Sequence, residues 1–398
     1  MSPLSKLGMR SRYMLCVTAS AIGRNSYFII VAWIVVNRSH GATLMAILLA
    51  VGSVAEFLTT NFGGRIIDRY NRWTVCFCCD FLRLAVIAGT MLAWRTFDPL
   101  LVLSISWTLY AVIYRTFLAS LQAMIPAFTD RDELVRMNSI FSTSTQAGNL
   151  AAAAAAGVLL VSVPQTAVFI LPIVCFSTSV VALAATELRT LSALRDAKAE
   201  IAGARACKKA GYSPVRIEAV AYAMTYAMGM IINVLASALV VSRPGGTALH
   251  FGYLEACWAV GSLFGCALLL CRNALLLRQT ALLFLSGFIL TVFLFANDLR
   301  VDFVLIILLG VTYNVARIIL DARIHRDISF EQLGRYRSRV HTLCVALGLL
   351  TYAGVALVSS SLPPATIFGY FGLLLLSASA VFVILERRGA AAGGLSRT

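Results

Sequence analysis

Four charged residues stand deep inside long apolar stretches of the sequence, and their side chains limit the chemistry that the chain can perform. Arg24 and Arg115 carry guanidinium groups, each able to hold a carboxylate through two parallel hydrogen bonds. Glu56 and Glu255 carry carboxyl groups, which at such depth either neutralise an arginine as a fixed counter-ion or take up and release a proton. Two arginines repel each other unless an acid or an anionic ligand joins them. We therefore expect a site for a small anion, with the two acids as candidates for proton coupling.

Further polar residues share helical faces with these charges. Successive offsets of four, seven and seven residues join Ser104, Thr108, Arg115 and Gln122. Those offsets keep one polar face on a helix with 3.6 residues per turn. Tyr27 lies about one turn beyond Arg24, so we expect Tyr27 to contribute to the same binding site.

The second half of the chain has polar faces of its own. Tyr222, Tyr226 and Asn233 fall on one face of an apolar stretch. Asn314 shares a face with Arg317 in a later stretch. An arginine close to the end of a span can extend its side chain into water, which favours a structural role for Arg317. We expect the two tyrosines and the two asparagines to contact the ligand.

Composition indicates the class of protein. Hydrophobic residues make up 60% of the 398 residues and charged residues 13%. Soluble proteins contain about 25% charged residues, so we expect a polytopic membrane protein. The net charge is +15, but most basic residues lie in short loops between apolar stretches. That distribution indicates membrane topology and contact with anionic lipid rather than nucleic-acid binding.

The sequence contains no pattern typical of an enzyme. No phosphate-binding loop of the G-x-x-x-x-G-K-[ST] type occurs, and no pairing of a nucleophile with a base stands out. The ten cysteines are scattered, and the cluster Cys76, Cys78 and Cys79 has no histidine nearby. Neither a metal site, a disulfide framework nor a cofactor is therefore expected. Transport would draw on an ion gradient or on the gradient of the substrate itself.

Charged residues, prolines and glycines divide the chain into twelve apolar segments, each near or above the ~20 residues that cross a bilayer. The segments are 12–37, 42–64, 74–94, 98–124, 135–162, 165–187, 217–242, 249–271, 275–296, 301–322, 336–360 and 364–385. With a cytoplasmic N-terminus, the outer loops hold four of the 33 basic residues, three lie within segments, and the other 26 face the cytoplasm. We therefore expect an all-α protein of the bacterial inner membrane with both termini cytoplasmic. No cleavable signal peptide is expected, because the first apolar run is too long.

A long polar stretch divides the twelve segments into two sets of six. It predicts a six-helix half over 1–188, a cytoplasmic linker over 189–214 and a second six-helix half over 215–398. The sequence Ala50-Val51-Gly52-Ser53 in the second segment recurs as Ala259-Val260-Gly261-Ser262 in the eighth. This repetition favours two pseudo-symmetric halves related as parallel repeats.

A short charged stretch joins the second and third segments. Gly64, Asp68, Arg69 and Arg72 match the pattern G-x-x-x-D-R-x-x-R, which resembles the signature loop of the major facilitator superfamily. Asn71 and Trp73 depart from the glycine and the basic residue that the family usually has there. The resemblance implies the fold of that superfamily, alternating access and a gating latch built on Asp68 and the arginines. It also implies that the first, fourth, seventh and tenth helices line the central cavity.

Other stretches resemble the branch of the superfamily that contains the macrolide-efflux and enterobactin-exporter-type proteins. They are Asp80-Phe81-Leu82-Arg83, Ala123-Met124-Ile125-Pro126 and Arg131-Asp132-Glu133-Leu134. Asp80 and Arg83 are three residues apart on a helix, so we expect them to pair with each other or with the signature loop as part of the gate. The fifth segment has Gly148-Asn149-Leu150, six alanines and Gly157 where many drug antiporters have a Gly-Pro-rich motif. This departure disfavours a multidrug antiporter.

The deep charges and the resemblance together favour a secondary transporter. The expected activity is export of a small anionic metabolite, such as a carboxylate siderophore, by alternating access coupled to protons. One alternative is a multidrug or macrolide efflux pump, and another is a non-transporting sensor with the same fold. The expected partners are the small-molecule substrate, protons and membrane lipid, without nucleic acid.

Overall fold

The computed structural model describes residues 3–39, 41–125, 134–185, 217–271, 278–327 and 330–395, which form twelve α-helices and one short 3-10 helix. The elements are α1 (Pro3–Ser39), α2 (Thr43–Arg69), α3 (Arg72–Ala93), α4 (Pro99–Ala123), α5 (Leu134–Ser162), η3 (Ala167–Phe169), α6 (Ile170–Ala184), α8 (Ile217–Ser242), α9 (Ala248–Cys271), α10 (Gln279–Val292), α11 (Leu299–Asp327), α12 (Phe330–Val358) and α13 (Pro364–Leu395). No strand occurs among these residues, so the predicted all-α class is confirmed.

The helices have the length and composition of membrane spans. Ten of those described are long and apolar enough to cross a bilayer, and Thr43–Leu58 of α2 and Gln279–Val292 of α10 are shorter apolar stretches. Each of the twelve helices overlaps one of the twelve predicted segments. The predicted linker, 189–214, lies outside the described residues, and the predicted domain boundaries remain a prediction.

Several helices extend beyond the predicted segments at their polar ends. α1 begins at Pro3, α11 continues to Asp327 and α13 continues to Leu395. Hydropathy detects only the part of a helix that matches hydrocarbon. Backbone hydrogen bonding continues in the same way into a polar environment, so the helices are longer than their apolar cores.

The charged stretch after the second segment is mostly helical, which corrects the predicted loop. Gly64 to Arg69 form the last turns of α2, and only Tyr70 and Asn71 separate α2 from α3. Asn71 is the N-cap of α3, where its side-chain Oδ1 accepts a hydrogen bond from the backbone N–H of Trp73 at 2.9 Å. Because this cap satisfies a backbone donor at the start of α3, the helix can begin at Arg72, directly after Asn71.

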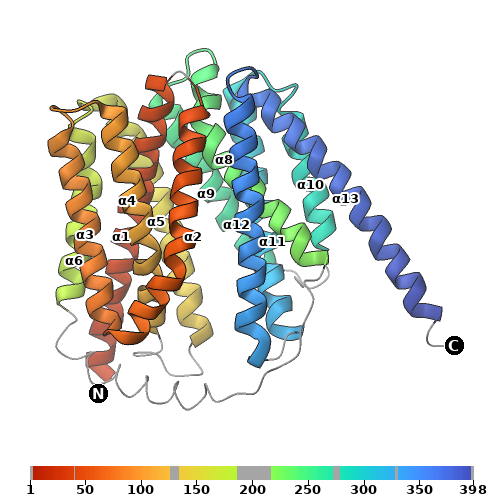
Figure 1. The fold of residues 1–398 in the computed structure, drawn as a ribbon, viewed down its shortest axis with the longest axis horizontal. Coiled ribbons are helices and arrows are strands. Elements are labelled where there is room, and N and C mark those ends of the chain that lie inside the picture. Colours follow the sequence, from red (N-terminus) through yellow and green to blue (C-terminus); the bar gives the residue numbers. More distant parts are fainter. Residues whose placement is uncertain are drawn as a thin grey trace. The chain divides into compact units, whose positions relative to one another are not determined.

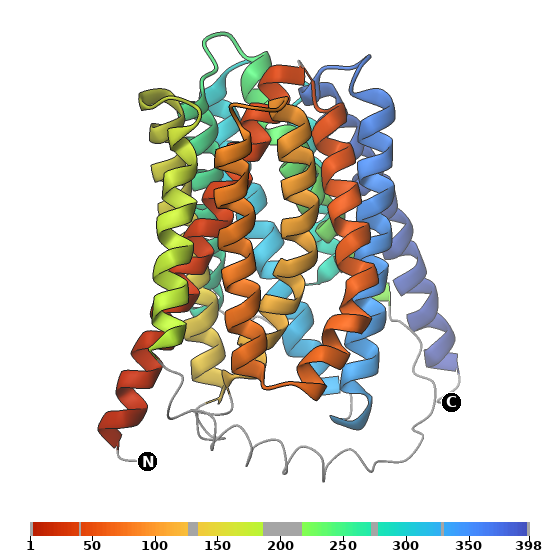
Figure 2. The same cartoon turned by 60° about the vertical axis from the view of Figure 1, so that its left-hand side comes forward.

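The chain divides into two compact units. The first comprises Met1–His40, Leu48–Lys208 and Thr247–Ala256, and the second comprises Gly41–Ile47, Lys209–Gly246 and Cys257–Thr398. Figures 1 and 2 show the helices of each unit as long rods that run side by side.

In the first unit, α1 is the central helix, packed against α5 and α6, while α3 packs against α4 and α6. Gly148 of α5 permits a close approach to α1, because a Cβ there would lie 2.8 Å from the Cβ of Ala21 and 3.1 Å from the carbonyl oxygen of Thr18. Gly157 and Gly252 meet in the same way, since a Cβ on Gly252 would lie 2.7 Å from the Cα of Gly157. The glycines and alanines of α5 therefore serve close helix packing.

In the second unit, α8 packs against α10, α11, α12 and α13, and α10 packs against α11 and α13. Ion pairs join α8 to α11 at both ends. Arg243 donates two hydrogen bonds to Asp302, at 2.8 and 3.0 Å, and Arg323 pairs with Glu218. α8 and α11 are therefore held as one antiparallel pair.

Candidate functional site

Arg24 lies in the middle of α1 and is only partly buried. Its Nη2 donates a hydrogen bond to Oδ1 of Asn149 at 3.2 Å, and its guanidinium carbon lies 5.6 Å from the ring centre of Tyr114. Within the described residues, Arg24 forms no ion pair. A neutral amide and an aromatic face thus hold this guanidinium in place of a directly bonded carboxylate.

Asn149 is itself held in place by α1 and α5. Its side-chain nitrogen donates to Oε1 of Gln146 at 3.0 Å, and its carbonyl oxygen accepts a hydrogen bond from Asn25 at 3.0 Å. The sequence analysis did not assign Gln146, Asn149 or Tyr114 to the site. The sequence signal that could have identified Gln146 and Asn149 is a pair of amide side chains three residues apart, just before a run of alanines.

Arg115 of α4 forms an ion pair with Glu56 of α2, with 3.7 Å between Nη1 and Oε1. Both side chains are about one-third exposed, at 29% and 35%. Glu56 also lies within electrostatic reach of Arg24. The pair is long and accessible, so another anion can compete for Arg115 without entering a closed core.

Glu255 of α9 belongs to the same unit as these charges. Only 9% of its surface is exposed, and it lies within electrostatic reach of Arg24. No hydrogen bond links its carboxyl group to another described residue. Arg24 thus lies within electrostatic reach of both acids, and among the described residues the one ion pair formed by these four side chains joins Glu56 to Arg115.

Tyr27 occupies a different environment from Arg24. Its side chain is fully buried, its hydroxyl is hydrogen-bonded to that of Ser106, and its ring packs 6.0 Å from Trp107 and 5.2 Å from Tyr110. The structure thus places Tyr27 in the aromatic contact between α1 and α4. We do not include it among the residues proposed to touch the ligand.

Asp80 and Arg83 form the ion pair that their spacing predicts, and both side chains are completely buried. Arg83 also donates to Oγ of Ser20 at 3.1 Å, and its guanidinium carbon lies 3.5 Å from the ring centre of Phe117. The pair joins α3 to α1 and α4 inside the first unit. Among the described atoms, Oδ2 of Asp80 and Nε and Nη1 of Arg83 have no hydrogen-bond partner.

The other signature residues lie at the end of α2. The helix includes Gly64, Asp68 and Arg69, but their side chains are outside the described part of the structure. Arg72 is the first residue of α3. Their proposed gating role remains a prediction.

The predicted site residues of the second unit have contrasting environments. Asn314 is buried, and its amide nitrogen donates to the carbonyl oxygen of Ser262 at 2.7 Å and to Sγ of Cys266 at 2.8 Å, which ties α11 to α9. Asn233 is the one exposed residue between positions 217 and 240 of α8. Asn314 thus helps to pack α11 against α9, Asn233 is accessible, and the predicted ligand contacts of both residues remain predictions.

The two tyrosines of α8 belong to an aromatic row. The ring centre of Tyr226 lies 6.5 Å from that of Tyr222 and 6.4 Å from that of Tyr313. Tyr222 is buried, and Tyr226 is partly exposed. Of the two, Tyr226 has the more accessible ring.

Known proteins resemble the chain in sequence pattern and in fold. The sequence profile of the Major Facilitator Superfamily matches residues 13–337. No curated protein sequence gives a significant match.

Solved transporter structures share the fold. A bacterial homologue of the iron transporter ferroportin, in an inward-facing state, is 17% identical with a TM-score of 0.75, over 98% of this chain and 99% of that one. A bacterial metal transporter is 16% identical with a TM-score of 0.66, over 96% and 98%. A peptide transporter of the POT type, in complex with sulfate, is 13% identical with a TM-score of 0.69, over 95% and 94%. Such identities show a common fold and no more.

Proposed function

The chain belongs to the Major Facilitator Superfamily and is thus a multi-pass membrane transporter, and we propose that it exports a small anionic metabolite. The proposed substrate class is a carboxylate siderophore or a similar secreted acid. Export follows from the sequence resemblance to the macrolide-efflux and enterobactin-exporter-type branch. The proposed mechanism is alternating access, with the substrate site open to one side of the membrane at a time.

The observation that carries the proposal is the environment of Arg24. Its guanidinium lies in the middle of a membrane span and forms no ion pair with a described residue. An unpaired charge at that depth is costly, and a carboxylate that accepts two of its hydrogen bonds offsets the cost. Among the described residues, Glu56 is the one ion-pair partner of Arg115, and the contact between them is long. The site has a net positive charge when Glu255 is protonated, which suits an anion.

A metal cation fits this site less well, although two of the structural neighbours are described as transporters of iron or another metal. Two arginines repel a cation. Within the described residues, no group of three or more His, Cys, Asp and Glu side chains comes together to hold a metal ion. The donor set and the charge both favour an anion.

Proton coupling is proposed to use Glu255, with Glu56 as the counter-ion of Arg115. A buried carboxyl group without hydrogen-bond donors is costly to ionise. The carboxyl group of Glu255 lies within electrostatic reach of Arg24, so the charge of Glu255 and the charge bound at Arg24 depend on each other.

The test is secretion by cells that synthesise a carboxylate siderophore and lack their own exporter for it. Iron-chelating activity in the medium measures export, and growth in ethidium measures protection against a cationic dye. We expect secretion without protection against ethidium. Protection without secretion would replace the anion exporter with the drug exporter, and the absence of any flux would favour the non-transporting sensor.

A further inference from the structure

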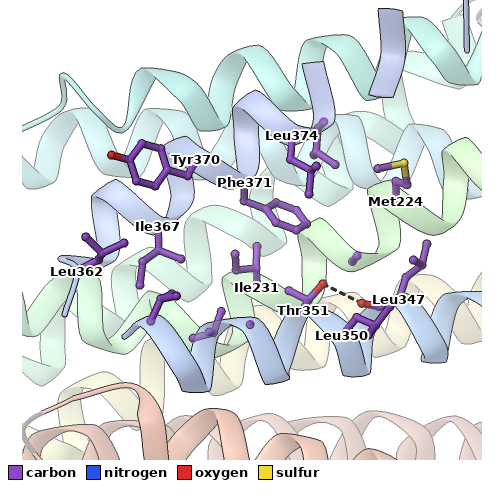
Figure 3. Close-up of a pocket in the computed structure, with 15 residues that line it drawn as sticks. Met224, Ile231, Leu347, Leu350, Thr351, Leu362, Ile367, Tyr370, Phe371 and Leu374 are labelled. Atoms are coloured by element: carbon purple, nitrogen blue, oxygen red, sulfur yellow. Dashed lines mark hydrogen bonds between the residues drawn. The ribbon is translucent and has the colours of Figure 1, made fainter. Parts of the chain in front are cut away.

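An apolar groove lies in the second unit, where α8 forms the floor and α12 and α13 form the walls. Its volume is about 440 Å³, within the ~300–1,000 Å³ of small-molecule sites. Figure 3 shows Ile231 of α8, Thr351 of α12 and Phe371 of α13 directed toward the same space. The groove contains none of the charged residues of the proposed anion site.

Apart from the hydroxyl of Tyr370, the lining offers no free polar side chain to a ligand. Of its fifteen residues, Thr351 and Tyr370 alone have polar side-chain atoms. The hydroxyl of Thr351 already donates to the carbonyl oxygen of Leu347 at 2.9 Å, as the dashed line in Figure 3 marks. Water and an anion would both lose hydrogen bonds on entering, so the occupant must be apolar.

The groove lies at membrane depth and opens at the surface of the unit. Its α12 and α13 residues belong largely to the spans Arg339–Val358 and Pro364–Leu385. At its rim, Leu350 is 69% exposed and Leu374 is 53% exposed. The lining is thus continuous with the surface that these helices present to lipid.

The helix arrangement explains why the groove exists. Gly287 and Gly372 bring α10 and α13 together, since a Cβ on Gly372 would lie 2.6 Å from the backbone nitrogen of Thr291. Toward its C-terminal end, α13 slants away from α12, as Figures 1 and 2 both show. On the α12 side, a Cβ on Gly354 would meet no atom within 4 Å. The space beside Gly354 is therefore open to whatever surrounds the helices.

We propose that this groove is a binding site for one acyl chain of a phospholipid of the surrounding bilayer. A methylene chain fills an apolar groove without leaving a polar group unsatisfied, and an empty groove forfeits the packing contacts of its lining. Tyr370 lies six residues beyond Pro364, about 9 Å along α13. Tyr370 is half exposed, and at that depth its hydroxyl can donate to the ester carbonyl of the lipid, as interfacial tyrosines do.

The test is cross-linking of the full-length protein in lipid nanodiscs with a phosphatidylcholine that carries a diazirine in one acyl chain. Peptide mass spectrometry then locates the adducts. We expect several-fold more adducts on residues 347–375 than on Phe284 and Phe288 of α10. These two residues are the control, because they are as exposed as Leu374 at the rim of the groove. Equal labelling of the two surfaces would reduce the site to ordinary annular lipid and overturn the proposal.

A variant pair separates occupancy of the groove from general exposure. Gly354→Leu should fill the groove and reduce the adducts on 347–375 several-fold. Gly89→Leu is the matched control, since Gly89 also lines an apolar groove, between α3 and α4, and its Cβ would also meet no atom within 4 Å. Equal loss in both variants, or no loss in Gly354→Leu, would contradict the proposal. Displacement of the adducts by ethidium but not by added phospholipid would assign the groove to a lipophilic cation instead.

Discussion

The guanidinium of Arg24 is the central group of the proposed anion site. A hydrogen bond to an amide and contact with a ring orient it without removing its charge. Arg115 differs, because Glu56 already occupies part of its surroundings. A substrate carboxylate would thus meet a free charge at Arg24 and compete with Glu56 at Arg115.

Substitution of these arginines should raise the KM for export. A hydrogen bond to a charged group contributes about 1.5–3 kcal/mol, so loss of one site should raise KM about 10- to 100-fold. We expect Arg24→Ala and Arg115→Ala to show this rise, measured as uptake of labelled siderophore into inside-out vesicles. Arg115→Lys should lose less, because it keeps the charge but not the paired geometry.

A matched control is available on the same helix. Arg38 lies at the far end of α1, where it donates to Gln165 at 2.8 Å. Arg38→Ala removes the same charge from α1 and should leave KM unchanged. Normal transport by both alanine variants of the deep arginines would exclude the proposed anion site.

The two glutamates should separate in a coupling assay. Glu255→Gln should abolish uptake driven by a proton gradient but retain exchange of labelled for unlabelled siderophore across the vesicle membrane. Glu56→Gln should retain coupling and bind the substrate more tightly, because Arg115 then lacks its competitor. The measurement is uptake with and without a protonophore, and the reverse pattern in the two variants would exchange their proposed roles.

Removal of Asp80 should destabilise the protein more than removal of the whole pair. Breaking a buried ion pair typically costs about 3–5 kcal/mol, because an uncompensated charge stays buried. Asp80→Leu should therefore lower the midpoint of thermal unfolding of the purified protein. The double variant Asp80→Leu/Arg83→Met should recover much of the loss. A double variant as unstable as the single one would show that the pair supports the fold through more than its charges.

Local spacing predicted some of these contacts and not others. The pairing of Asp80 with Arg83 follows from a three-residue offset on one helix, so the sequence alone was sufficient. The partner of Glu56 depends on the register of α2 against α4, which spacing within a helix does not define. The burial of Tyr27 depends on the rotation of α1 within its bundle, which spacing within a helix does not define either.

At the scale of helices, hydropathy predicted the number of elements but not their ends. The apolar cores of the predicted segments all fall within observed helices, because twenty or so apolar residues have few other stable conformations in a bilayer. The polar ends depend on caps and local contacts, such as the Asn71 cap of α3. Hydropathy therefore predicted a loop for the charged motif that forms the last turns of α2.

Small residues control how closely the helices pack. Gly52 of α2 lies against α4, where a Cβ would come 3.0 Å from Nε1 of Trp107. Gly261 of α9 lies against α11, where a Cβ would overlap the carbonyl oxygen of Ile307. The two glycines come from the repeated Ala-Val-Gly-Ser sequence. In each set of six helices, this glycine lies on the second helix and permits the close approach of the fourth. Close helix packing thus explains the repeated glycine in each unit.

Gly261→Ala should destabilise the second unit, because the overlapping group is backbone and must move. Such overpacking costs about 1–3 kcal/mol. The control is Gly89→Ala, which meets open space and should gain up to about 1 kcal/mol from helix propensity. The midpoint of thermal unfolding in detergent distinguishes the two variants. Equal midpoints for Gly261→Ala and Gly89→Ala would show that α9 and α11 move apart at little cost.

At the scale of the whole molecule, alternating access requires units that move without deforming. The second unit is held rigid by ion pairs, since Arg243–Asp302 and Arg323–Glu218 join α8 to α11 at both ends. The first unit has the buried Asp80–Arg83 pair among α1, α3 and α4. Buried and partly buried ion pairs thus hold each unit together, while the charges of the proposed anion site stay loosely paired.

The signature at the end of α2 offers a test of the cycle itself. Asp68 lies in the last turn of a helix that ends at Arg69. An acid there opposes the helix dipole by about 0.3–1 kcal/mol, so its position is a local cost that a role elsewhere must offset. Asp68→Asn should therefore leave stability unchanged or slightly higher, while transport falls about tenfold or more if the latch contributes at least 1.4 kcal/mol to one state of the cycle.

The measurements are vesicle uptake, membrane abundance and thermal unfolding of the same Asp68→Asn preparation. Asp98→Asn is the matched control. Asp98 is an exposed acid that caps α4 by accepting a hydrogen bond from the N–H of Leu101 at 3.0 Å, and asparagine keeps that cap. Since Asp98 is outside the signature, its replacement should change neither stability nor uptake. Wild-type uptake by Asp68→Asn at normal abundance would mean that the end of α2 does not gate transport, and that the dipole cost of Asp68 is offset by a contact that stays the same throughout the cycle.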